Sequence, residues 1–167
     1  GGLDVAFLGL AQMDAAGNIN VSKFGPKIAG CGGFINITQN THKVFFCGTF
    51  TAGGLKVKVE DGKVIIAQEG KQKKFLKDVE QITFNGDIAL QNKQEVMYIT
   101  ERCVFQLKED GMHLTEIAPG IDLQTQILDM MDFEPIVDRD ANGEIKLMDA
   151  KLFAEGLMGL KEMKESC

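Results

Sequence analysis

The chain has 167 residues, which fits one domain at the usual scale of about 100–200 residues per domain. Hydrophobic residues make up 44% and charged residues 25%, with only 3 Pro, so the composition is that of a soluble globular protein and excludes disorder as the main state. Lys and Arg number 18 against 24 Asp and Glu, and the net charge of −6 argues against nucleic acid or an anionic membrane as a partner.

Apolar runs and cysteines exclude further classes of protein. The longest apolar runs, such as residues 5–11, fall far short of the ~20 residues that span a bilayer, so no membrane segment is expected. The chain has no CxxC pair and only two His, so its cysteines do not form a zinc pattern. Widely spaced cysteines predict reduced thiols in a cytoplasmic protein; they are Cys31, Cys47, Cys103 and Cys167. The chain opens on Gly1 rather than Met, which indicates a processed chain or a piece of a longer protein, and the second is the favoured interpretation.

The first third of the chain alternates apolar runs with glycine-rich turns. Residues 3–10 form an almost continuous apolar run, which predicts a strand covered on both faces in the middle of an α/β sheet. Further on, Phe34, Ile37 and Thr41 share one face at helical spacing. The elements expected after the first strand are a returning strand at 19–24, a short helix at 34–42 and a buried strand at 43–50.

The middle of the chain predicts an antiparallel hairpin. Residues 55–59 alternate apolar and basic side chains, an Asp-Gly turn follows, and an apolar run returns the chain to Gln68. The Lys-rich residues 71–74 are interpreted as a solvated turn between strands, with a phosphate contact as the alternative.

The last part predicts more strands and two helices. Strand-like runs flank Glu101 and Arg102, and a third follows the next Asp-Gly turn. Asp122 has the side chain to cap a helix at 123–131, whose methionines are expected to fill the core. A final amphipathic helix is expected at 149–163.

Residues 138–144 alternate Asp and Asn before a glycine, which is the pattern of a calcium loop, and Asp149 stands at the twelfth position. The residues before Asp138 are of extended rather than helical type. A polar surface turn is therefore the favoured interpretation, and a calcium site the alternative.

Three glycines in four positions make Gly30-Cys31-Gly32-Gly33 the segment best suited to chemistry. Glycine allows positive φ and close approach of another group, and successive N–H groups in such a bend can bind a carboxylate, a phosphate or an oxyanion. A tight, closely packed turn explains the pattern equally well, with Cys31 as a small side chain that fills space. The two His lie near no nucleophile motif, which excludes a hydrolase triad.

A second glycine-containing loop, at residues 49–56, directly follows a predicted buried strand. The carboxyl ends of strands form the edge at which α/β sheets bind ligands. A plain connection from strand to hairpin is the alternative.

Ordered sequence blocks lie at residues 2–14, 17–23, 30–35, 99–105, 117–122 and 132–135. Together they resemble the C-terminal, β-subunit-like part of family I CoA-transferases of the bacterial acetate, propionate or acetoacetate type, over about four fifths of the chain. The resemblance implies an open α/β sheet with flanking helices and an antiparallel hairpin region. It also implies that residues 1–167 are a single domain, a fragment of the C-terminal domain, without the N-terminal domain.

The resemblance implies an enzyme that moves CoA between a short-chain acyl-CoA and a carboxylate through a glutamyl-CoA thioester. The nucleophilic glutamate of the family lies in a Glu-x-Gly motif upstream of Gly1, and Glu101 is expected to be a structural partner of Arg102 or of backbone groups. Coenzyme A is then a substrate. The implied partners are the acyl-CoA, the carboxylate and the rest of the same chain, in a homo-oligomer. The alternative is a non-catalytic module that senses an acyl-CoA or a sugar phosphate.

The resemblance carries over to few residues. Gly30, Cys31, Gly32 and Gly33 match the family loop that lies against the catalytic glutamate near the thioester. Gln12 matches a glutamine near the acyl site. A loop near CoA is matched by Thr51, Gly53, Gly54 and Lys56, although Lys56 also fits a solvent-exposed position on a strand.

Overall fold

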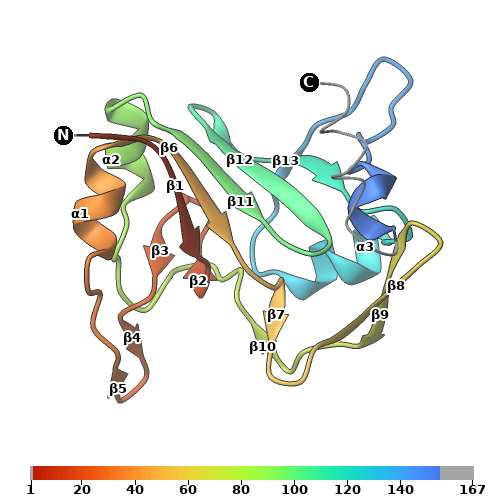
Figure 1. The fold of residues 1–167 in the computed structure, drawn as a ribbon, viewed down its shortest axis with the longest axis horizontal. Coiled ribbons are helices and arrows are strands. Elements are labelled where there is room, and N and C mark those ends of the chain that lie inside the picture. Colours follow the sequence, from red (N-terminus) through yellow and green to blue (C-terminus); the bar gives the residue numbers. More distant parts are fainter. Residues whose placement is uncertain (1, 155–167) are drawn as a thin grey trace.

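The computed structural model describes residues 2–154 and contains a six-stranded mixed sheet (Figure 1). In spatial order its strands are β1 (Leu3–Gly9), β6 (Thr41–Cys47), β11 (Glu95–Ile99), β12 (Cys103–Lys108), β13 (Gly111–Ile117) and β14 (Ile136–Val137). β1, β6 and β11 are parallel, β12 and β13 continue the sheet in antiparallel fashion, and β14 is parallel to β13. The expected α/β fold with antiparallel hairpins is confirmed.

Shorter elements lie around this sheet. Four two-stranded units pair β2 with β3, β4 with β5, β7 with β10 and β8 with β9. The strands are β2 (Gln12–Met13), β3 (Ile19–Asn20), β4 (Lys23–Phe24), β5 (Lys27–Ile28), β7 (Thr51–Ala52), β8 (Lys56–Glu60), β9 (Lys63–Gln68) and β10 (Gln72–Lys73). The helices are α1 (Phe34–Gln39), α2 (Gly86–Gln91) and α3 (Leu123–Gln126), with 3₁₀ turns η1 (Leu128–Met130) and η2 (Ala150–Phe153). Among the described residues, no helix has the length and apolar character of a membrane span.

The core lies on one face of the sheet. α1 packs against β1 and β6, and α2 packs against β11 and β12 (Figure 1). On this face Phe46 is fully buried and stacks on Phe34 of α1, with ring centroids 5.8 Å apart. A second aromatic group joins Phe75 to Phe50 and Phe105, at 4.3 Å and 5.3 Å between centroids. This second group anchors the segments that follow β6 and β10.

The opposite face of β1 is open within the described residues. Leu3, Val5 and Phe7 are 49%, 44% and 71% exposed, and Phe7 stacks on Phe45 of β6. The expected strand is present, but the prediction that both its faces are covered is wrong for residues 2–154. The apolar run reflects apolar side chains on both faces, and this part of the chain covers only one of them.

The predicted strand at 19–24 is two short strands, β3 and β4, so that prediction is wrong. The Asn20 side-chain oxygen accepts hydrogen bonds from the amides of Ser22 and Lys23, both at 3.1 Å. Such a local side-chain turn competes with the strand ladder and breaks it.

The helix predicted at 34–42 is present but ends at Gln39, and Thr41 already belongs to β6. Its buried face consists of Phe34 and Thr38, whereas Ile37 is 37% exposed. Thr38 lies one helical turn after Phe34 and donates its hydroxyl to the Phe34 carbonyl at 3.0 Å, so a polar residue occupies the buried face. The predicted strand at 43–50 likewise ends early, at Cys47.

Asp122 caps α3 as predicted, because its carboxylate accepts from the Thr125 amide at 2.8 Å. The helix is shorter than expected: Ile127, fully buried with φ −123°, leaves the helical conformation, and a 3₁₀ turn follows. Met131 is buried in the core, as predicted. Of the helix predicted at 149–163, Asp149 caps η2, and residues 155–163 lie outside the described residues.

Residues 138–144 form a polar turn tied to its own backbone. Asp140 accepts from the amides of Asn142 and Glu144, and Asp138 points back to the sheet, where it contacts His113 and Lys108. Within residues 2–154, no group of three or more His, Cys, Asp or Glu side chains is arranged to hold a metal ion.

Tyr98 on β11 is fully buried and donates its hydroxyl to the Gly17 carbonyl at 2.6 Å. Tyr98→Phe removes the donor and leaves that carbonyl unpaired, so we expect the free energy of unfolding to fall by about 1–2 kcal/mol. Urea denaturation of the two proteins measures the difference. A Tyr98→Phe variant as stable as wild type would contradict a structural role for this bond.

His113 on β13 predicts a pH dependence of stability. The hydrogen bond to Asp138 raises the pKa of His113 above its ordinary value of 6.5; burial opposes this rise, and a second bond to Asp110 reinforces it. Because the pKa of His113 is higher in the folded protein, protonation of His113 stabilises the fold. This stabilisation is fully present below pH 6.5 and is lost as the pH rises through the folded-state pKa. The stability advantage of wild type over His113→Gln should therefore shrink above pH 6.5, as urea unfolding across this range measures.

The control for this prediction is His42→Gln, because His42 is exposed. In the His42→Gln background, the His113→Gln replacement should have the same pH-dependent effect, because His42 makes none of the contacts that hold His113. An advantage over His113→Gln that stays constant with pH would show that the two carboxylates do not set the titration of His113.

Candidate functional site

The glycine loop Gly30–Gly33 lies exposed between β5 and α1. Gly30 and Gly32 have φ +77° and +50°, in the left-handed region that favours glycine. A Cβ on either of them would meet nothing within 4 Å. Within residues 2–154, the amides of all four loop residues donate to no backbone or side-chain acceptor. The loop is thus an open bend with free N–H groups rather than a closely packed turn.

Cys31 is half-buried and packs against the core, as expected for a side chain that fills space. Its carbonyl accepts from the Phe34 amide at 3.0 Å, which leads the bend into α1. In this loop the Cys31 side chain is anchored in the core, whereas the glycines Gly30, Gly32 and Gly33 are exposed.

Gln12, on β2 just after the carboxyl end of β1, is held by polar neighbours. Its side-chain oxygen accepts from Asn20 at 2.7 Å, and its amide group lies 3.4 Å from Glu80. Glu80 in turn accepts from the Gly25 amide at 2.6 Å, in the segment that leads to the glycine loop. Neither partner of Gln12 was predicted from the sequence: Glu80 lies 68 residues away, and Asn20 becomes a partner through the pairing of β2 with β3.

The second predicted loop follows β6 and runs through β7 into the hairpin of β8 and β9. Thr51 is fully buried, and its hydroxyl donates to Glu69 at 2.5 Å. Gly53 and Gly54 are exposed with φ +79° and +98°, and Lys56 is exposed on β8, as its alternating pattern predicted. Thr51 therefore presents no exposed surface, and the exposed residues of this predicted set are Gly53, Gly54 and Lys56.

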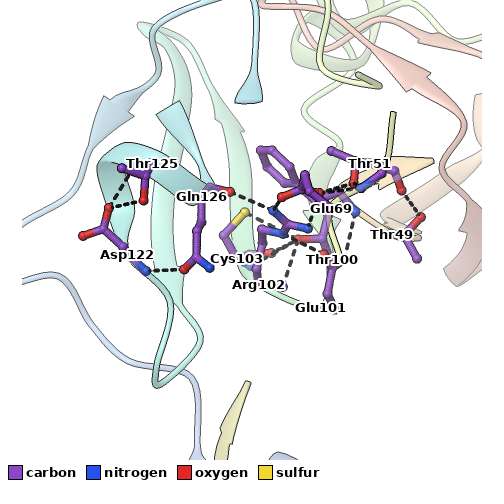
Figure 2. A network of polar contacts seen from close by, with 12 residues as sticks. Thr49, Thr51, Glu69, Thr100, Glu101, Arg102, Cys103, Asp122, Thr125 and Gln126 are labelled. Atoms are coloured by element: carbon purple, nitrogen blue, oxygen red, sulfur yellow. Dashed lines mark hydrogen bonds and ion pairs between the residues drawn. The ribbon is translucent and has the colours of Figure 1, made fainter. Parts of the chain in front are cut away.

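A buried arginine stands at the base of this loop (Figure 2). The Arg102 side chain is 0% exposed, and its Nε donates to Glu101 at 2.7 Å. Its two Nη atoms donate to Glu69 at 2.7 and 3.1 Å, and Nη1 also donates to the Gln126 carbonyl at 2.9 Å. The predicted pairing of Glu101 with Arg102 is confirmed, and Glu101 also accepts from the Phe50 amide at 2.8 Å. Its carboxylate is thus engaged in structure, as expected.

Lys74 holds the same loop and adds a second cation to the group formed by Arg102, Glu101 and Glu69. It is 8% exposed and donates its ammonium to the Thr49 carbonyl at 2.6 Å. The prediction of a solvated turn at 71–74 is wrong, because residues 72–73 form β10 and Lys74 is buried. Burial lowers the pKa of Lys74, and the charge of Glu101 partly offsets that effect. Glu69, Lys74, Glu101 and Arg102 are called the charge quartet below; it holds two carboxylates and two cations.

Hydrogen bonds favour the charged forms of Glu69 and Arg102. Burial alone would raise the pKa of Glu69, but bonds from Arg102, Thr51 and the Gly70 amide outweigh it and hold that pKa below its usual value. Burial likewise opposes the charge of Arg102, and Glu69 and Glu101 reverse the effect and raise its pKa. Glu69 carried no signal in the sequence, because its partners Thr51 and Arg102 lie 18 and 33 residues away.

The structure does not bring the two predicted loops together. In Figure 1 the glycine loop lies beside α1, whereas β7 lies apart from it, beyond β2 and β3. Gln12 is joined through Glu80 to the segment before the glycine loop. The structure therefore has two separate candidate segments. One is the open Gly30–Gly33 bend, and the other is the loop at residues 49–56 held by the charge quartet.

Comparison with known proteins gives close sequence relatives. Acetate CoA-transferase YdiF of Escherichia coli K12 is 55% identical over 159 residues, which cover 95% of this chain and 29% of that protein. Caffeate CoA-transferase of Acetobacterium woodii is 56% identical over 165 residues, which cover 96% of this chain and 30% of that protein. The chain thus spans about 30% of the length of these curated relatives. No protein-family model matches it.

Solved structures agree with the sequence relatives. The acyl-CoA transferase YdiF of E. coli O157:H7, in a thioester complex with CoA, superposes with a TM-score of 0.89 at 54% identity, over 94% of this chain and 30% of that one. The decarboxylase AibA/AibB, at 16% identity and a TM-score of 0.63, shares the fold over 96% of this chain and 56% of its own. The resemblance found in the sequence blocks is confirmed.

Proposed function

We propose that this chain, which is homologous to one stretch of the acetate and caffeate CoA-transferases, forms part of an enzyme that exchanges CoA between a short-chain acyl-CoA and a carboxylate. The observation that carries the proposal is the open Gly30–Gly33 bend, whose amides have no acceptor within residues 2–154. Homology to named transferases favours this function over a sensing module.

The nucleophile is a glutamate supplied by polypeptide outside this sequence. Its carboxylate oxygen attacks the acyl carbonyl, the C–S bond breaks, and CoA leaves as the thiolate with a mixed anhydride remaining. The thiolate then attacks the glutamyl carbonyl, which forms the glutamyl-CoA thioester and releases the carboxylate. An incoming carboxylate reverses both steps and departs as the new acyl-CoA. Negative charge develops on a carbonyl oxygen in each addition.

The glycine bend supplies what these additions need. Free N–H groups that are already oriented stabilise an oxyanion without reorganisation, and loss of one such donor typically costs about 3–4 kcal/mol of transition-state stabilisation. The thioester complex of the YdiF relative supports a covalent CoA intermediate in this kind of enzyme. Coenzyme A takes part as a substrate, and the chemistry requires no other cofactor.

The test compares two proteins with acetyl-CoA as donor and propionate as acceptor: the full-length polypeptide and residues 1–167 alone. We expect propionyl-CoA from the full-length protein and no turnover from residues 1–167, because the glutamate lies outside them. Mass spectrometry of the full-length protein with acetyl-CoA should show a CoA adduct on a glutamate. Turnover by residues 1–167, or an inactive full-length protein, would overturn the proposal.

A further inference from the structure

Thr49, Phe50 and Thr51, which follow Gly48 after the end of β6, are each held by a different charged side chain. Lys74 donates to the Thr49 carbonyl at 2.6 Å, and Glu101 accepts from the Phe50 amide at 2.8 Å. Glu69 accepts from the Thr51 hydroxyl at 2.5 Å. This short stretch of backbone is thus fixed residue by residue.

Arg102 joins the two carboxylates of this arrangement (Figure 2). Its guanidinium bonds Glu101 through Nε and Glu69 through both Nη atoms, and it lies 4.9 Å from the centroid of the Phe50 ring. The same group bonds the Gln126 carbonyl at the end of α3. One buried side chain therefore holds the β11–β12 turn, the segment between β9 and β10, and α3 around the loop.

Stability alone does not explain a cluster of two buried cations and two half-buried carboxylates. Removing ions from water is costly, and apolar side chains of the same shape often stabilise a fold equally well or better. What a hydrogen-bonded charge cluster adds is a single geometry, because every bond has a direction. The loop selected in this way lies at the carboxyl end of β6, at the edge where α/β sheets bind ligands.

We propose that Glu69, Lys74 and Arg102 are positioning residues that hold the loop at residues 49–54 in the geometry that binds acyl-CoA. This inference rests on the proposed function. The exposed residues of the loop are Thr49, Gly53 and Gly54, whereas Phe50 and Thr51 are fully buried and the Thr51 hydroxyl faces Glu69. The quartet has no contact with substrate and acts through the loop.

The test uses the full-length protein and the variant Arg102→Lys, which keeps the charge but loses the planar fork that reaches both carboxylates. We expect KM for acetyl-CoA to rise about 10-fold while kcat stays within about 2-fold of wild type. Hydrogen exchange should accelerate in residues 49–54 and stay unchanged in β11–β13. The matched control is Arg139→Lys, whose side chain bonds an exposed turn and should leave all three readouts unchanged.

Thr51→Val is the second variant, for use if Arg102→Lys does not fold. It removes one hydroxyl and keeps the side-chain shape, and KM should rise about 3-fold with kcat unchanged. Unchanged exchange in the loop, or faster exchange without a change in KM, would overturn the inference. A uniform loss of protection with KM unchanged would mean a merely structural role, which also overturns it. If the wild-type protein is inactive, the proposed function fails, whereas the exchange readout still reports on the loop.

Discussion

Arg102→Met should lower the free energy of unfolding by about 3 kcal/mol, one of the largest effects expected in this chain. Removal of one partner from a buried ion cluster typically costs about 3–5 kcal/mol, since the remaining charges are left without compensation. We expect the lower end, because the side chains of Glu101 and Glu69 are 17% and 28% exposed and water can reach them. Urea unfolding measures the difference.

Two comparisons separate this explanation from simple loss of packing. Arg102→Met combined with Glu69→Gln and Glu101→Gln removes the uncompensated charges and should recover part of the lost stability. Arg139→Met, at an exposed turn, should change stability by less than about 0.5 kcal/mol. If the triple variant were no more stable than Arg102→Met alone, the cost would lie in packing around Phe50 rather than in charge.

Features set by neighbouring residues were predictable from the sequence. The hairpin of β8 and β9 followed from alternating side chains around Asp61-Gly62, and both turn residues have the positive φ, +51° and +72°, that a tight hairpin requires. The strands around Glu101 and Arg102, and the cap of α3 by Asp122, were read from equally local patterns. Local chemistry decides such features, so a sequence reveals them.

Features set by distant partners were not predictable. Lys74 lies in a run of basic residues that reads as solvated, yet it is buried because the Thr49 carbonyl, 25 residues earlier, offers an acceptor. Glu69 gave no signal for the same reason. Likewise, the apolar run at β1 does not indicate which part of the polypeptide packs on each face of this strand. The role predicted for the glycine loop came from the resemblance to CoA-transferases rather than from the local pattern. The structure shows that this loop is an open bend.

Gly33→Ala offers the sharpest separation of function from folding. Gly33 has φ −82°, which alanine adopts freely, and a Cβ there would meet only Ile37, at an ordinary 3.7 Å. We therefore expect a change in stability of less than about 0.5 kcal/mol. For the reaction proposed above, we expect the added methyl group to hold the reacting carbonyl about 1 Å away from the loop amides in the full-length protein, which costs on the order of 100-fold in kcat.

The matched control is Gly143→Ala, at an exposed turn where a Cβ meets nothing within 4 Å. Its φ of +81° strains alanine by about 1 kcal/mol, so this variant should lose stability and keep its rate, the reverse of Gly33→Ala. Thermal unfolding and steady-state rates with acetyl-CoA and propionate measure both quantities. A Gly33→Ala enzyme with wild-type kcat would place the glycine bend away from the reacting groups, and the oxyanion role would have to pass to other amides.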